Sequence, residues 1–95
     1  MFVRHEAEKD ISTAYVWYEK QRPGLGDDFL LCIEAVLDAI RTNPHQYAIV
    51  HKQVRRALLR RFPHAVFYFD NGTDISVIAV FHCSRNPTSW QKRSN

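Results

Sequence analysis

The sequence predicts an α+β fold, in which a short N-terminal strand and an antiparallel helical hairpin pack on a mainly antiparallel, twisted four-stranded sheet. Two observations lead to this prediction. Residues 65–81 carry a β-hairpin signature around Asn71-Gly72, and the preceding half carries two amphipathic stripes joined at Pro23-Gly24. The expected order of elements is β-α-α-β-β-β. At 95 residues the chain makes a single domain, 1–95.

The first two elements are a short strand and an amphipathic helix. Met1 to Arg4 can form the strand, and from about Glu6 the apolar residues follow a helical period. They recur at i, i+4, i+7, i+8 and i+11, as Ala7, Ile11, Ala14, Tyr15 and Tyr18. Acidic side chains crowd the first turns, where the helix dipole favours negative charge. Pro23-Gly24 ends this helix, because proline cannot continue its hydrogen bonds.

A second helix is expected from about Asp27 to Arg41. Its apolar residues have the same spacing, as Phe29, Ile33, Val36, Leu37 and Ile40. Asp27 or Asp28 can cap its first free N–H groups, and Asn43-Pro44 stops it. The short bend makes the two helices antiparallel. Residues 43–53 are expected to form a loop.

Three strands are expected in the second half of the chain. Val54 to Phe62 forms one of them, and Pro63 separates it from the hairpin 65–81, whose strands are apolar on both faces and so are expected to be buried. A short helical turn can follow from Pro87. Since the helices cover one face of the sheet, the opposite face would carry arginines with late aromatic and histidine residues. We interpret that face as the candidate functional face.

The two cysteines, Cys32 and Cys83, are too few for a disulfide scaffold. Each lies in an apolar segment, which favours buried thiols in a reducing compartment. No apolar stretch is long enough to span a membrane, and the N-terminus lacks the apolar region of a signal peptide, so we expect a cytoplasmic protein with no membrane contact. The histidines and cysteines do not have the spacing of metal ligands, so we expect neither a metal nor a cofactor.

Charge is distributed unevenly along the chain. Residues 1–51 hold five basic and eight acidic side chains, a net charge of −3, whereas residues 52–95 hold eight basic and two acidic ones, a net charge of +6. This asymmetry favours one basic face that binds nucleic acid or an acidic protein segment. We expect the binding residues to be Arg55, Arg56, Arg60, Arg61, Arg85, Trp90, Lys92 and Arg93.

Two further groups of residues have both a functional and a structural interpretation. His82 could act as a general acid or base beside Arg85, which could stabilise a phosphorane, but His82 could also be a strand-end residue bonded to backbone. Trp90 could hold the C-terminus on the core. Trp17 lies off the apolar stripe of its helix, so it marks a partner groove or packs on the inter-helix bend.

Several motifs together resemble the RelE/ParE superfamily of toxins from bacterial toxin–antitoxin systems. They cover nearly the whole chain: Trp17 to Gly26 with Phe29, Asn43-Pro44, Arg61 to Tyr68, Ile78 to His82, and then Arg85, Pro87 and Trp90. The resemblance implies a helical hairpin on an antiparallel sheet. It also implies a type II toxin that forms a hetero-oligomer with a cognate antitoxin, whose partly disordered segment covers the basic surface.

The resemblance leaves two branches open. RelE-like relatives cleave messenger RNA on the ribosome with basic residues, among them an arginine on the first hairpin strand, and usually a tyrosine near the C-terminus. Here Ala65 holds the arginine position and Trp90 stands near the tyrosine position. ParE-like relatives inhibit DNA gyrase by binding, with no established catalytic residue, and we prefer this branch. The alternatives are an endoribonuclease that uses Arg85, His82 and Arg61, or a non-toxic antitoxin-binding remnant.

Overall fold

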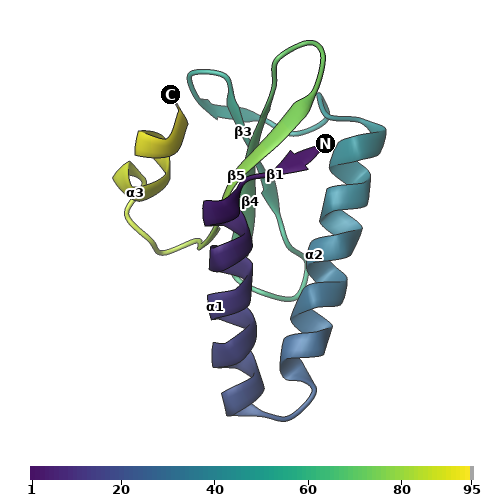
Figure 1. The fold of residues 1–95 in the computed structure, drawn as a ribbon, viewed down its shortest axis with the longest axis vertical. Coiled ribbons are helices and arrows are strands. Elements are labelled where there is room, and N and C mark those ends of the chain that lie inside the picture. The colour runs from purple at the N-terminus through teal and green to yellow at the C-terminus, as the bar shows by residue number, and fades with distance from the viewer. Residues whose placement is uncertain (95) are drawn as a thin grey trace.

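The computed structural model describes residues 1–94 as a helical hairpin packed on a five-stranded sheet (Figure 1). The elements are β1 (Phe2–Val3), α1 (His5–Gln21), α2 (Leu25–Thr42), β2 (Ile49–His51), β3 (Val54–Leu58), β4 (His64–Asp70), β5 (Ile75–His82), α3 (Thr88–Gln91) and a final 3₁₀ turn, η1 (Lys92–Ser94). The sheet order is β1-β5-β4-β3-β2. The β1–β5 pair is parallel and the other pairs are antiparallel, so the predicted α+β class is confirmed.

The predicted four-stranded sheet is wrong by one strand. The fifth strand, β2, lies in the segment expected to be a loop and pairs with the start of β3 through an irregular register. Three residues are too few to show an alternating pattern, so the sequence carried little signal for it. The expected strand over 54–62 also ends early, at Leu58, because the chain turns and Leu59 N donates to His64 O at 3.0 Å.

The second helix begins at Leu25, two residues earlier than expected, and neither Asp27 nor Asp28 caps it. Its N-cap is Gly24, with a φ of 89°, a conformation that glycine adopts without strain. The carboxylate of Glu19, on α1, accepts hydrogen bonds from Gly24 N at 3.1 Å and from Gly26 N at 2.9 Å. The cap therefore comes from the preceding helix, a contact that ties the two helices together at their bend.

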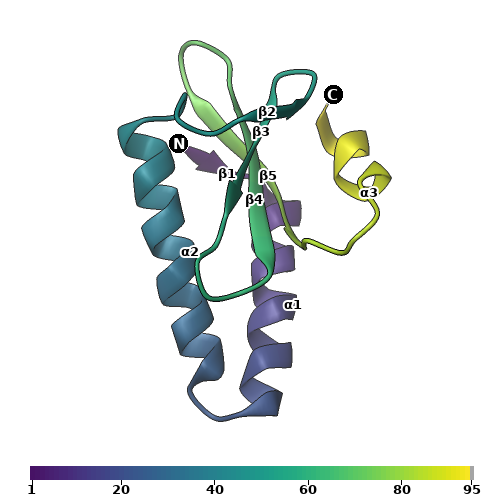
Figure 2. The ribbon, with the colours of Figure 1, turned by 180° about the vertical axis from the view of Figure 1, so that it is seen from behind.

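The core has two layers, one on each face of the sheet. The layer between sheet and helices holds Tyr18, Phe29, Ile33, Val36, Ile40, Ala57, Leu59, Phe62, Val66, Tyr68, Val77 and Val80. The second layer holds Val54, Ala65, Phe67, Ile78, Ala79, Phe81 and Trp90. The expected burial of both hairpin strands is confirmed. Seen from behind, α3 lies beside the strands, apart from α1 and α2 (Figure 2).

The expectation of a buried thiol is wrong for Cys83. This residue is exposed because β5 ends at His82, and Cys83 begins the turn that leads to α3. Cys32 is half-buried on α2. Among residues 1–94, no helix combines the length and the apolar character needed to cross a membrane.

Candidate functional site

Strand register assigns the arginines of β3 to two different faces. Arg56 lies opposite Phe67, and Leu58 lies opposite Ala65, so these four residues share the face away from the helices. Arg55 lies opposite Tyr68 on the helix-covered face. The first arginine pair is therefore split across the sheet, as strand geometry requires.

Arg55 holds the loop between α2 and β2. Its Nη1 donates to the carbonyl of Tyr47 at 2.6 Å. The neighbouring Tyr68 hydroxyl donates to the carbonyl of Pro44. Burial raises the pKa of Tyr68 to about 12, and the nearby Arg55 charge opposes that shift. Arg55 thus satisfies loop carbonyls next to a buried phenol and presents little of its charge outward.

Arg60 and Arg61 follow the end of β3 and are both exposed. Arg61 Nη2 lies 3.6 Å from the carboxylate of Asp28 in the first turn of α2. Arg60 lines a groove of about 400 Å³ between α2 and β3, whose walls also include Ala35, Ala39 and Leu58. Arg60 is therefore the more available of the two cations.

Arg56 and Arg85 flank a small pocket of about 70 Å³ at the end of the second core layer. The floor of the pocket includes Ala65 and Trp90. The indole of Trp90 is only 6% exposed and stacks on Phe67, with ring centroids 4.3 Å apart and an angle of 20° between the planes. Trp90 therefore holds the C-terminal turn on the sheet, as its structural interpretation predicts, and offers a partner little surface.

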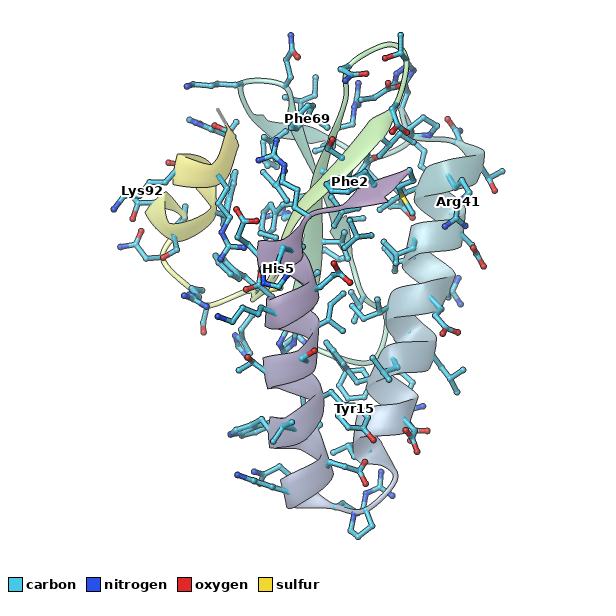
Figure 3. All side chains as sticks on the ribbon, viewed as in Figure 1. Phe2, His5, Tyr15, Arg41, Phe69 and Lys92 are labelled. Carbon is cyan, nitrogen blue, oxygen red and sulfur yellow. The ribbon has the colours of Figure 1, made fainter. Side chains whose placement is uncertain are left out.

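Arg93 makes internal contacts whereas its neighbour Lys92 is exposed, as is also the case for Arg55 and Arg56 on β3. Arg93 Nη1 pairs with the Asp10 carboxylate at 2.7 Å and donates to the carbonyl of Ile78 at 3.1 Å. Lys92 is exposed and points away from the sheet (Figure 3). The guanidinium carbon of Arg85 lies 4.0 Å from the centroid of the Phe81 ring. Arg85 is nevertheless exposed to solvent. The accessible cations of the predicted binding set are thus Arg56, Arg60, Arg85 and Lys92, with Arg61 paired at the surface.

Two histidines and Arg85 line a pocket of about 390 Å³ that opens between α1 and the end of β5. The rings of His64 and His82 are 5.3 Å apart. His82 is exposed, and its Nδ1 accepts a hydrogen bond from Ser84 N at 3.0 Å, the backbone contact that its structural interpretation predicts. His64 is buried, with its Nδ1 3.3 Å from the Tyr18 hydroxyl. Burial, with a smaller contribution from His82, lowers the pKa of His64 to about 4.

Trp17 lines the same pocket. Its side chain is 57% exposed, and its ring meets Tyr18 edge-on with centroids 5.0 Å apart. Thr13 and Ala14, one turn earlier on α1, continue the wall of the pocket. An exposed indole in the wall of a pocket is a feature of partner surfaces.

Within residues 1–94 no cluster of histidine, cysteine or acidic side chains could hold a metal ion. The pocket beside Arg85 contains His82 and His64 as acid–base groups, together with Tyr18 and with Asp10, which pairs with Arg93. Arg61, the third residue expected for a nuclease, pairs with Asp28 on α2 and lines neither of the pockets that contain His82.

The family model that matches the chain is described as the ParE toxin of the type II toxin–antitoxin system, parDE, and the match covers residues 2–87. The chain belongs to the ParE toxin family. A similar solved structure is described as "Chromosomal ParDE TA system from P. aeruginosa". Its TM-score is 0.75 at 18% identity, and the alignment covers 86% of this chain and 95% of that one, which is a likeness of fold. No curated protein gives a significant sequence match.

The structure of this ParE toxin divides the predicted binding residues into two groups. Arg56, Arg60, Arg85 and Lys92 are exposed, whereas Arg55 and Arg93 make internal contacts. Sequence reasoning missed the partners of the internal group, because Asp10 and Arg93 lie 83 residues apart. It also gave no role to the His64–Tyr18 contact, for which the only signal was a histidine at the start of an otherwise apolar strand.

Proposed function

We propose that this ParE-family toxin inhibits DNA gyrase by binding it, has no catalytic activity of its own, and is neutralised by a cognate antitoxin in the cytoplasm. The observation that carries the proposal is the chemistry of the sheet face away from the helices. Ala65, fully buried, occupies the position at which an RNA-cleaving relative is expected to carry an arginine. The stacked Trp90–Phe67 pair fills the space beside it.

Cleavage at a 2′-hydroxyl needs a base and cations placed around one phosphate. Arg56, Arg85 and His82 line the small pocket, but the buried residues in its wall, Ala65, Phe67 and Trp90, are apolar, and its volume is about 70 Å³. That space is too small for a nucleotide, since ligand pockets usually occupy about 300 Å³ or more. These features favour recognition through a surface over chemistry at this face.

The larger histidine pocket supports the runner-up function, an endoribonuclease. There His82 is accessible to act as a base and Arg85 lies beside it. Arg61, which pairs with Asp28, would be left out of that site. A third possibility, a non-toxic remnant that only binds an antitoxin, needs no such site.

Induced expression in a sensitive bacterium separates the three functions. Gyrase inhibition predicts filamentation and a DNA-damage response, together with loss of supercoiling when the purified chain is mixed with gyrase. Rapid translation arrest with cuts in ribosome-bound messenger RNA would overturn this proposal in favour of the nuclease. The Arg85→Gln and His82→Gln variants sharpen the comparison, because a nuclease would lose its cutting activity. Normal growth would point to the remnant.

Antitoxin neutralisation has its own test. The acidic segment expected of the antitoxin should bind the accessible cations, so Arg60→Glu should weaken the complex more than Arg61→Glu does, because Asp28 already pairs with Arg61. The exposed Arg22, at the inter-helix bend, gives a control in Arg22→Glu. Equal affinity for Arg60→Glu and wild type would remove Arg60 from the interface.

A further inference from the structure

The pocket of about 390 Å³ between α1 and the end of β5 has room for one small organic ligand. Its α1 wall runs from Asp10 to Tyr18, a length of about 12 Å at the rise of an α-helix. The segment that joins β5 to α3 passes alongside α1 and contributes Arg85 (Figures 1 and 2). The volume falls within the range of small-molecule pockets, which begins at about 300 Å³.

Two side chains in the wall of this pocket suit an anionic group. His82 Nδ1 accepts a hydrogen bond from Ser84 N at 3.0 Å, so the neutral ring carries its proton on Nε2. The guanidinium carbon of Arg85 lies 4.0 Å from the centroid of the Phe81 ring, a contact that helps to hold the planar cation in place. An imidazole N–H beside a guanidinium fork matches the oxygens of a phosphate or a carboxylate.

His64 supplies a further donor from the interior. It is 8% exposed, lines the pocket, and has its Nδ1 3.3 Å from the Tyr18 hydroxyl. A phenol proton directed at Nδ1 satisfies Tyr18 and leaves the proton of the neutral ring on Nε2. Among residues 1–94, Nε2 has no hydrogen-bond partner. Since every fully buried side-chain nitrogen in that range has one, Nε2 is accessible from the pocket and open to an acceptor atom of a ligand.

The remaining wall of the pocket is largely apolar. It includes Val80 and Phe81 of β5 and the 57% exposed side chain of Trp17. The ring contact that Trp17 makes among the described residues is edge-on with Tyr18, so a face of its indole is available for stacking. The pocket thus combines a flat aromatic surface, a neutral N–H donor and an anion site. A matching ligand is planar and aromatic, has an acceptor in its ring system, and carries one anionic group.

We propose that this pocket binds a free purine nucleoside monophosphate. The base stacks on Trp17, and one of its ring nitrogens accepts from His64 Nε2. The phosphate lies between Arg85 and His82. Purines combine a large π-face with ring nitrogens that accept hydrogen bonds, and base–aromatic stacking is a favourable contact. The inference does not rest on gyrase inhibition and assigns the pocket a ligand of its own.

Other ligands would satisfy fewer of these groups. Inorganic phosphate would leave the indole and His64 without a partner. An acidic peptide with a phenylalanine would supply a ring and a charge, but that ring has no nitrogen to accept from His64. A nucleic-acid strand carries one phosphate per nucleotide, whereas the described walls of the pocket contain one arginine and no lysine. The Asp10 carboxylate is also in the wall, where its charge is compensated by Arg93.

The probe is AMP, added to the full chain at physiological salt. Calorimetry gives its Kd, and quenching of Trp17 emission in a Trp90→Phe background reports the stack. Trp17→Ala should weaken binding about fivefold or more through loss of that stack. Arg85→Gln should weaken it about tenfold or more, since a charge-assisted hydrogen bond is lost. The matched control is Arg41→Gln, the same change of charge near the end of α2 and outside the pocket (Figure 3), which should bind AMP as the wild type does.

Two analogues separate the parts of the ligand. Adenosine, which lacks the phosphate, should bind about tenfold or more weakly than AMP. Phenyl phosphate keeps the anion and a ring but has no ring nitrogen, so it should also bind more weakly. The imidazole nitrogen resonances of His64 should shift with AMP and not with phenyl phosphate, a result that general electrostatic attraction would not produce.

The inference would be overturned by an absence of saturable AMP binding, by unchanged affinity in both Trp17→Ala and Arg85→Gln, or by equal affinity for phenyl phosphate. A 5′-phosphorylated pentadeoxyadenylate strand should bind no more tightly than AMP. Binding of that strand about tenfold or more tightly would replace the free nucleotide with single-stranded nucleic acid and so overturn the proposal. None of these results bears on gyrase inhibition, which the growth and supercoiling assays test separately.

Discussion

Asp10 and Arg93 form an ion pair that joins the first helix to the last turn, with 2.7 Å between Oδ2 and Nη1. The same Asp10 oxygen accepts the Val80 N–H of β5, and Arg93 also donates to Ile78 O. The side chains of Asp10 and Arg93 thus make hydrogen bonds to backbone groups of β5 that a longer β1 strand would otherwise have made. The carboxylate is 12% exposed and the guanidinium 22%, so the pair is shielded from most of the solvent.

Asp10→Asn should destabilise the fold by about 1–3 kcal/mol, because the amide can accept the Val80 N–H but leaves the half-buried Arg93 without its counter-charge. Chemical denaturation measures the change in the free energy of unfolding. Arg93→Met tests the other partner, since it removes the charge and keeps much of the apolar stem near Phe81.

The double variant Asp10→Asn, Arg93→Met completes the cycle. If the ion pair is the source of the effect, the double variant should lose less stability than the sum of the two single losses. Additive losses would show that the two residues stabilise the fold independently. Glu8→Gln, an exposed acid on the same helix, is the control and should change stability by less than about 0.5 kcal/mol.

The network around Asp10 marks the limit of sequence-based prediction for this fold. The helix stripes, the Pro23-Gly24 bend and the Asn71-Gly72 hairpin are local patterns, and each was recognisable. The partners of Asp10 are a backbone N–H on β5 and a C-terminal arginine, and neither leaves a periodic signal. The three-residue strand β2 was missed for a related reason, because its pairing with β3 is tertiary and irregular.

Gly26 permits the close approach of the two helices. A Cβ at this position would lie 2.8 Å from the ring of Tyr15 and 2.9 Å from the Glu19 carboxylate (Figure 3 shows Tyr15 between the helices). Gly26→Ala should therefore destabilise the fold by about 1–3 kcal/mol, as overpacking does in a tight contact. Thermal or denaturant unfolding measures this change.

Gly24→Ala gives a comparison with a different physical cause. No atom lies within 4 Å of a Cβ built on Gly24, but its φ of +89° strains any L side chain. Its cost should be about 1 kcal/mol and should not change when Tyr15 is shortened to alanine. Part of the Gly26→Ala cost should vanish in a Tyr15→Ala background. An equal cost in both backgrounds would refute the steric explanation.

His64 should make stability depend on pH. Its pKa is about 4 in the folded chain, against 6.5 for the free side chain, so between these values the unfolded chain binds the extra proton. The free energy of unfolding should therefore fall as the pH decreases from 6.5 towards 4, with a slope of at most about 1.4 kcal/mol per pH unit. Denaturation curves from pH 7 to 5 measure it before most carboxylates titrate.

The variant His64→Gln keeps a hydrogen-bonding group near the Tyr18 hydroxyl and removes the titration. Its stability should be lower at pH 7 but flatter between pH 7 and 5. His5→Gln, at the exposed first residue of α1, should retain the wild-type slope. A wild-type slope in His64→Gln would assign the pH dependence to other groups.

The cations of the candidate site could be predicted from the sequence, but which of them are exposed and which make internal contacts could not. Seven cations in residues 55–93 were expected to share one basic surface. In the structure Arg55 donates to the carbonyl of Tyr47, eight residues earlier, Arg93 pairs with Asp10 and Arg61 pairs with Asp28, and no local sequence pattern indicates these contacts. The exposed cations that remain for partners are Arg56, Arg60, Arg85 and Lys92.

The two tryptophans should respond differently to substitution. Trp90 is 6% exposed and stacks on Phe67, so Trp90→Ala should cost about 3–5 kcal/mol. Trp90→Phe keeps an aromatic ring there and should cost less. Trp17 is 57% exposed, so Trp17→Ala should change stability by less than about 1 kcal/mol. Unfolding curves measure these differences. The fluorescence emission of tryptophan reports the environment of each indole: the blue-shifted component should remain in Trp17→Phe and be lost in Trp90→Phe.

If Trp17→Ala folds normally but loses toxicity on induced expression, its indole belongs to the surface that contacts the cellular target. Full toxicity in that variant would leave Trp17 outside that surface.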